Sequence, residues 1–173
     1  SGSLGKSAAG LKCLEFRESL SEKALMALKI DHEILIQAHH QPEPRFDIVK
    51  LLSKTQALTS MVDISDGLSS EIHHLANSSD CGFEVIENQI PIDPITRRAA
   101  QELSARGVPK ASSYDLAWDG GEDYQLLMTL NPLEWQKAIT TFPELEALIT
   151  IIGKAVPANN GITLLRLDGK SEQ

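Results

Sequence analysis

The chain has 173 residues and a mass of 18.9 kDa, and 42% of its residues are hydrophobic, enough for one globular domain with a buried core. Its 16 basic and 24 acidic residues give a formal charge of −8 without any basic run, so we expect no nucleic-acid groove and no binding to a membrane surface. No apolar run approaches the roughly 20 residues of a membrane span. Cys13 and Cys81 lack the spacing of metal ligands, which favours free thiols and a cytoplasmic protein over a disulfide.

The first part of the chain, residues 1–56, is predicted to be a mainly helical lead-in. Apolar residues recur there at helical spacing, and the proline pair in Gln41–Pro44 interrupts the pattern because proline removes a backbone donor. The predicted helices begin at Ser7 and cover residues 21–30, 31–38 and 48–52.

The remainder, residues 57–173, is predicted to be an α+β core. Alternating or continuous apolar runs predict strands over residues 57–64, 82–86, 123–130, 148–153 and 162–167, the last ending in a turn at Asp168-Gly169. Helices are predicted over residues 68–76, 95–105 and 131–139, and a loop over 157–161. Strands and helices alternate irregularly, so we expect a single α+β domain with one mixed β-sheet and helices packed on one side.

The octet Met61–Leu68 combines an apolar run with two carboxylates, a hydroxyl and a glycine at a predicted strand-to-helix turn. Asp63 and Asp66 are candidate ligands of a divalent metal such as Mg²⁺, because hard oxygen ligands suit that ion. Ser65 is a candidate hydrogen-bond donor to a phosphate. In the alternative interpretation Asp66 caps the following helix, which accounts for only one of the two acids.

A second polar cluster, Asp119–Tyr124, stands at the start of a predicted strand. Gly120 and Gly121 allow the backbone to approach a ligand closely, and Glu122 and Asp123 follow at once. The alternative is an ordinary glycine turn whose acids face solvent.

A third segment, Gly5–Gly10, resembles the end of a P-loop but lacks the glycine that such a loop needs five residues earlier. The backbone of Gly5 and Ser7 is still a candidate phosphate contact at a helix start, and tight helix packing is the alternative. The pairs His39-His40 and His73-His74 are poor chelates, because adjacent helical residues point about 100° apart.

Taken in order, four segments resemble those of thiamine-monophosphate kinases and, more broadly, of the aminoimidazole-ribonucleotide-synthetase-like superfamily of ATP-using enzymes. The segments are Leu4–Leu11, Pro42–Arg45, Asp63–Leu68 and Gly120–Tyr124. The resemblance covers residues 4–169 and implies the C-terminal domain of a two-domain kinase that phosphorylates thiamine monophosphate with ATP and Mg²⁺. It also implies that the N-terminal domain, with most aspartate ligands and the homodimer interface, is absent from this chain.

By the same resemblance, Asp63 and Asp66 would each hold a Mg²⁺, Ser65 would contact ATP, and Glu122 would contact thiamine monophosphate. No residue is assigned to covalent or acid–base catalysis, since phosphoryl transfer proceeds by positioning and charge neutralisation. The sequence departs from the family's pattern at Lys6, Asp119 and Gln125, and ends at Gln173, short of the family's aromatic-bearing tail.

The main interpretation is therefore one domain of a kinase, which would be inactive by itself. Two alternatives remain open. The first is a non-catalytic binding or regulatory module of the same fold. The second is another ATP-using enzyme of the superfamily.

Overall fold

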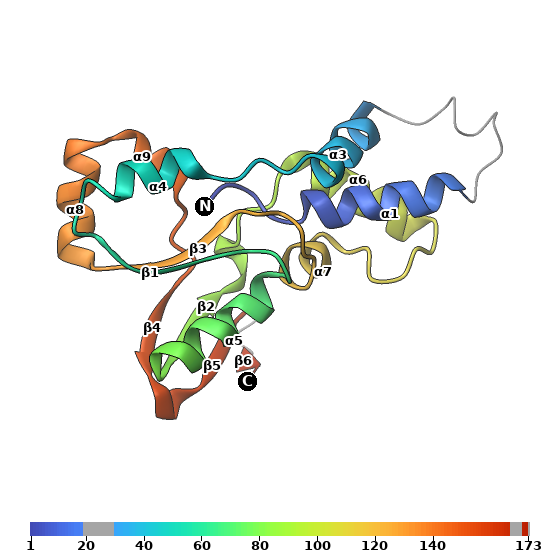
Figure 1. The fold of residues 1–173 in the computed structure, drawn as a ribbon. Helices are drawn as coiled ribbons and strands as arrows, with labels where there is room; N and C mark the ends of the chain where they lie inside the picture. The colour runs from blue at the N-terminus through green and yellow to red at the C-terminus, as the bar shows by residue number, and fades with distance from the viewer. Residues whose placement is uncertain (19–29, 167–170, 173) are drawn as a thin grey trace.

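The computed structural model describes residues 1–18, 30–166 and 171–172 (Figure 1). The helix predicted over residues 21–30, except its last residue, and the turn at Asp168-Gly169 lie outside the described residues. The described elements form three groups, each with its own apolar cluster.

The first group is a helical bundle, on the right of Figure 1. Helices α1 and α3 pack along each other, and α6 and α7 contact them. The cluster between them contains Cys13, Leu35 and Leu103, none of which is exposed. The helices are α1 (Lys6–Glu18), α3 (Ile30–His40), α6 (Pro94–Ala105) and α7 (Ser113–Trp118).

The second group combines a two-stranded antiparallel ribbon with three short helices, on the left of Figure 1. Asn131 links the two parts: it follows β3, and its side chain caps α8 by accepting hydrogen bonds from the amides of Leu133 and Glu134. The elements are β1 (Leu58–Asp63), β3 (Leu126–Leu130), α4 (Phe46–Leu52), α8 (Pro132–Thr141) and α9 (Glu144–Leu148).

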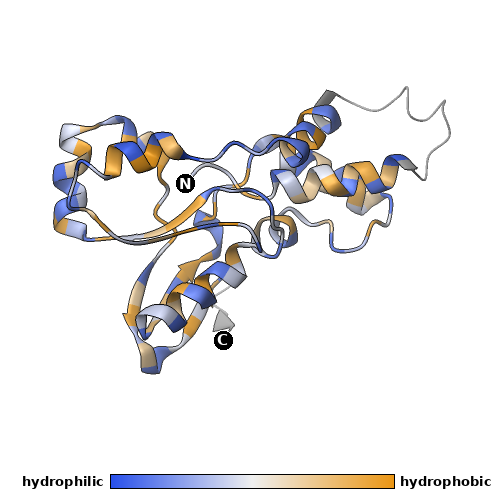
Figure 2. Ribbon diagram, in the orientation of Figure 1, coloured by the Kyte–Doolittle hydropathy of each residue, from blue (hydrophilic) through white to orange (hydrophobic). Residues whose placement is uncertain are grey.

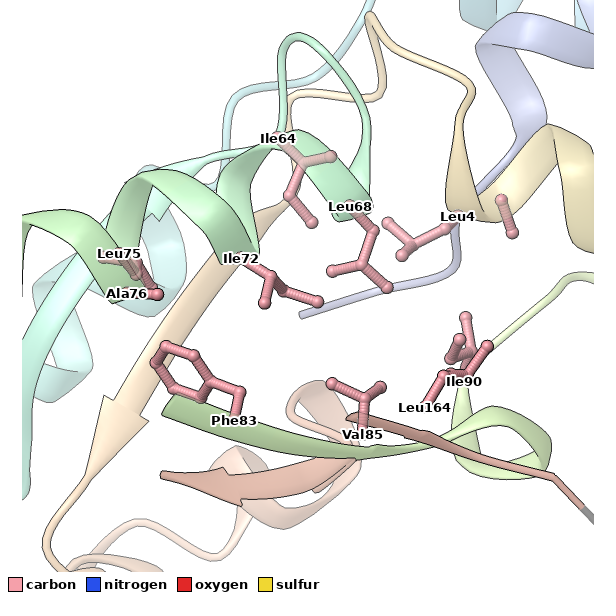
Figure 3. Close-up of a cluster of buried hydrophobic side chains, with 11 residues drawn as sticks. Leu4, Ile64, Leu68, Ile72, Leu75, Ala76, Phe83, Val85, Ile90 and Leu164 are labelled. Atoms are coloured by element: carbon pink, nitrogen blue, oxygen red, sulfur yellow. The ribbon is translucent and has the colours of Figure 1, made fainter. Parts of the chain in front are cut away.

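The third group is a four-stranded mixed sheet in the order β4-β2-β5-β6, packed against helix α5 (Leu68–Ser79). Strands β2 and β5 are parallel, and the other two pairings are antiparallel. Figure 3 shows Leu68 and Ile72 of α5 directed towards Phe83 and Val85 of β2. The strands are β2 (Cys81–Ile86), β4 (Gly153–Pro157), β5 (Ile162–Leu165) and β6 (Ser171–Glu172), with short 3-10 helices η1 (Glu87–Gln89) and η2 (Ala158–Asn160).

Hydrophobic residues recur along the strands and alternate with hydrophilic ones along the helices in Figure 2, as expected for elements that each bury one face. Among the described helices, none is both long and apolar enough to cross a bilayer.

The α+β class is confirmed, but the prediction of one sheet is wrong, because β1 and β3 form a separate sheet. The strand predicted over residues 148–153 is also wrong: α9 ends at Leu148 and β4 begins at Gly153. Some apolar residues of this segment pack in a hydrophobic core without forming a strand; Ile149, for example, is buried in the cluster of the second group. Short helices α7 and α9 were not predicted, because five or six residues carry too little periodicity to detect.

Candidate functional site

The octet lies where β1 ends and α5 begins. Strand β1 exposes every second residue, which brings the Asp63 side chain to the exposed face. Asp66 is also exposed. Helix α5 has Gly67 at its N-cap and no side-chain hydrogen bond to its first amides, so the interpretation of Asp66 as a helix cap is wrong. Capping therefore does not occupy the Asp66 carboxylate.

Glu71, which sequence reasoning missed, supports the octet from within the protein. Glu71 is 2% exposed, and its Oε1 accepts hydrogen bonds from the Asp66 amide at 3.3 Å and the Ser65 hydroxyl at 3.5 Å. Oε2 lies 3.0 Å from Nδ1 of His74. The available signal was an acid on the apolar face of the predicted helix, between Leu68 and Leu75.

The second cluster lies directly against the octet. The Glu122 amide donates to the Ser65 carbonyl at 2.8 Å, and the Tyr124 amide donates to the Ile64 carbonyl at 3.0 Å. A Cβ atom added at Gly121 would overlap with the Ser65 carbonyl oxygen, so this approach requires glycine. The ladder between β1 and β3 thus continues into both clusters and joins them.

Asp123 points inward from the second cluster and is 8% exposed. Its carboxylate accepts hydrogen bonds from the amides of Gly5, at 2.6 Å, and Ser7, at 3.1 Å, where α1 begins. Burial raises the pKa of Asp123 to about 6, against the opposing effect of these donors. The amides of Gly5 and Ser7, predicted as phosphate contacts, are therefore already engaged by a carboxylate.

Two further contacts define the start of α1. Lys6 forms an ion pair with Asp93, at 2.9 Å, and Asp93 caps α6. A Cβ atom added at Gly10 would overlap with the Leu35 carbonyl, so the small residues of this segment do serve tight helix packing.

Glu122 is exposed, whereas its neighbour Asp123 is buried. A hydrogen bond to Glu122 raises the pKa of the Tyr124 phenol, and the negative charges of Asp63 and Asp66 raise it further. Asp63, Asp66 and Glu122 are all exposed where the backbone bonds join the two clusters, which together present one acidic surface. We call these four residues, Asp63, Asp66, Glu122 and Tyr124, the acidic face.

The acidic face is not a complete metal site. Within the described ranges, no three histidine, cysteine, aspartate or glutamate side chains converge as metal ligands. Asp63 and Asp66 nevertheless offer the hard carboxylate oxygens that Mg²⁺ prefers, in a solvent-accessible position. The chain fits part of a Mg²⁺ site whose remaining ligands would come from water, substrate or another protein segment.

Two cavities lie apart from the acidic face. One, of about 450 Å³, is mainly apolar and lies between strand β3, helix α5 and strands β2 and β4. The other, of about 480 Å³, is polar and is lined by Lys6, Arg45 and Gln125 among others. Arg45 in this cavity binds Asp47 through two hydrogen bonds of 2.8 and 3.0 Å and Gln125 through a third of 3.1 Å.

No protein-family model matches the chain, but individual known proteins do. The chain is 30% identical over 174 residues to thiamine-monophosphate kinase of Bacillus subtilis (strain 168), an alignment that covers 98% of the chain and 47% of that enzyme. The chain therefore spans about half the length of the curated relatives it matches.

Solved structures agree with the sequence comparison. The structure of AaThiL complexed with AMPPCP and TMP superposes with a TM-score of 0.75 at 30% identity, over 98% of this chain and 46% of that one. HypE of E. coli, a hydrogenase maturation protein, gives a TM-score of 0.68 over 99% of this chain and 47% of its own. Its identity is 18%, so HypE shares the fold alone.

Proposed function

We propose that this chain, which is homologous to the C-terminal domain of thiamine-monophosphate kinases, supplies that domain's part of the ATP-dependent phosphorylation of thiamine monophosphate to thiamine diphosphate. The observation that carries the proposal is the joining of two clusters, 57 residues apart at Ser65 and Glu122, by the 2.8 Å hydrogen bond between their backbones. That bond brings together the residues expected to bind metal, nucleotide and substrate.

Each residue of the joined clusters has a proposed role. Asp63 and Asp66 each contribute a carboxylate to a Mg²⁺ ion, and Ser65 contacts ATP. Glu122 contacts thiamine monophosphate, while Gly121 keeps the backbone close to the octet and Gly120 keeps it close to Leu116 and Ala8. Bound Mg²⁺ would neutralise the charge on the phosphates during transfer.

The remaining metal ligands are proposed to come from an N-terminal domain, which would correspond to the part of the relatives that this chain does not match. The whole enzyme is proposed to be homodimeric and cytoplasmic. The match to about half of each relative supports the first point. The incomplete ligand set of the acidic face supports it independently. Free thiols at Cys13 and Cys81 are compatible with a reducing compartment.

A chimera tests this proposal. The chain replaces the matched segment of the Bacillus subtilis kinase, and Mg²⁺-dependent formation of thiamine diphosphate from ATP and thiamine monophosphate is measured. We expect activity in the chimera and its loss in the Asp66→Ala variant. Asp80→Asn is the matched control, because Asp80 is exposed in a left-handed C-cap that asparagine tolerates.

Two results would contradict the proposal. Normal transfer by the Asp66→Ala chimera would remove the assigned role of Asp66. A correctly folded chimera that binds both substrates without forming product would identify the chain as a binding module.

A further inference from the structure

The side chain of Asp123 ties the second cluster to helix α1. Its two carboxylate oxygens are both used: one accepts from the Gly5 amide at 2.6 Å and the other from the Ser7 amide at 3.1 Å. With 8% of its surface exposed, it is shielded from any substrate on the acidic face. Asp123 therefore acts on the site only through its neighbours.

The backbone on either side of Asp123 has an unusual conformation. Glu122 has a φ of 67° and Tyr124 a φ of 49°, in the left-handed region that residues with side chains avoid. Such a conformation persists only where surrounding contacts hold it. The contacts that hold it here are the hydrogen bonds of the Asp123 carboxylate to α1 and the backbone hydrogen bonds of Glu122 and Tyr124 to the octet.

The same conformation decides which side chains reach the surface. Asp123 is turned into the protein, and Glu122 is exposed at the surface with its amide bonded to Ser65, between Asp63 and Asp66 in the octet. If the carboxylate of Asp123 released α1, the two strained residues on either side could relax to ordinary φ values. Glu122 and the Tyr124 phenol would then leave their positions beside the octet.

We propose that Asp123 is a positioning residue that, by accepting the amides of Gly5 and Ser7, fixes Glu122 and Tyr124 beside Asp63 and Asp66. The catalytic consequence rests on the proposed kinase function. The structural consequence does not, so the two are tested by separate measurements.

The first measurement uses this chain alone. Asp123→Asn keeps the size of the side chain but turns an NH₂ group towards one of the two amides. We expect hydrogen exchange at Gly5 and Ser7 to accelerate by about tenfold or more, as for amides that lose a stable partner. We also expect exchange of the Glu122 and Tyr124 amides, which are bonded to the Ser65 and Ile64 carbonyls of the octet, to accelerate by a similar factor.

The same measurements on Asp80→Asn should match the unsubstituted chain. Circular dichroism verifies the fold of each variant, and Asp123→Ser, with a small neutral acceptor, is the second variant if the asparagine variant does not fold. Unchanged exchange at Gly5 and Ser7, or at Glu122 and Tyr124, in a folded Asp123 variant would overturn the positioning role. A residue that merely capped α1 would alter the exchange at Gly5 and Ser7 alone.

The second measurement uses the chimera and a double-mutant cycle. We expect Asp123→Asn and Glu122→Gln each to raise KM for thiamine monophosphate by about tenfold, with the double variant no worse than Glu122→Gln alone, since coupled residues are not additive. If the increases in KM of the two single variants multiplied in the double variant, the claim that Asp123 acts through Glu122 would be overturned. A chimera that is inactive with both residues intact would refute the kinase function instead, and the exchange measurements would still decide the positioning role.

Discussion

The buried Asp123 carboxylate makes a distinct contribution to the pH dependence of stability. Asp123→Asn removes the only ionisation at this position between pH 4 and pH 7. The difference in unfolding free energy between the two proteins therefore isolates the titration of Asp123 as pH is varied.

The sign and size of this difference follow from the pKa of Asp123, which burial raises from 3.8 to about 6 in the folded protein. Below pH 3.8 the group is neutral in both states and carries no penalty. As pH rises through 3.8 the unfolded chain ionises first, so the folded state loses stability until pH exceeds about 6. At about 1.4 kcal/mol for each pKa unit, the full loss is about 3 kcal/mol, most of it between pH 4 and pH 7.

Urea unfolding at pH 4, 5, 6 and 7, followed by circular dichroism, measures the effect. The unsubstituted chain should lose stability relative to Asp123→Asn as pH rises, and Asp80→Asn should follow the unsubstituted chain. A difference between the two proteins that changes by less than about 1 kcal/mol over this range would refute the argument, since extrapolated stabilities resolve such a change. A change in the opposite direction would mean that the Gly5 and Ser7 amides outweigh the cost of burial.

Three further outcomes are expected. Gly121→Ala should destabilise the chain by about 1–3 kcal/mol in urea unfolding, because the added methyl group overlaps with the Ser65 carbonyl; an unchanged midpoint would contradict the close approach. Glu71→Ala should cost about 1–3 kcal/mol in the same assay, since the partly buried Ser65 hydroxyl and Asp66 amide lose their acceptor, and equal stability would rule out its supporting role. Calorimetry of the chain alone should show weak Mg²⁺ binding, because Asp63 and Asp66 supply too few ligands, and a Kd near 1 μM would contradict this.

The sequence predicted well where local chemistry decides the structure. The alternation and length of the apolar runs predicted β1, β2, α5 and α6 closely, and Asp93 capped α6 as its Asp-Pro pair indicates. The order of the four segments also indicates the kinase family, because the spacing of acids and glycines along a chain is a property of the sequence itself.

Prediction failed where distant segments decide the outcome. The strand predicted over residues 123–130 begins only at Leu126, because Glu122 and Tyr124 adopt left-handed φ values. Nothing in their side chains indicates that conformation; contacts with the octet and α1 impose it. The division into two sheets was likewise hidden, since pairing partners lie far apart in the chain.

The order of residues establishes which of them bring charge and hydroxyl groups to the turns, and hence that Asp63, Asp66, Ser65 and Glu122 are candidates for phosphate and metal chemistry. Which acids are available depends on the folded chain. Folding exposes Asp66 and buries Asp123, although both follow glycine-rich or apolar runs and either could have faced solvent. The physical reason is that the burial of a carboxylate depends on the amides that meet it, and those of Gly5 and Ser7 lie more than a hundred residues away from Asp123.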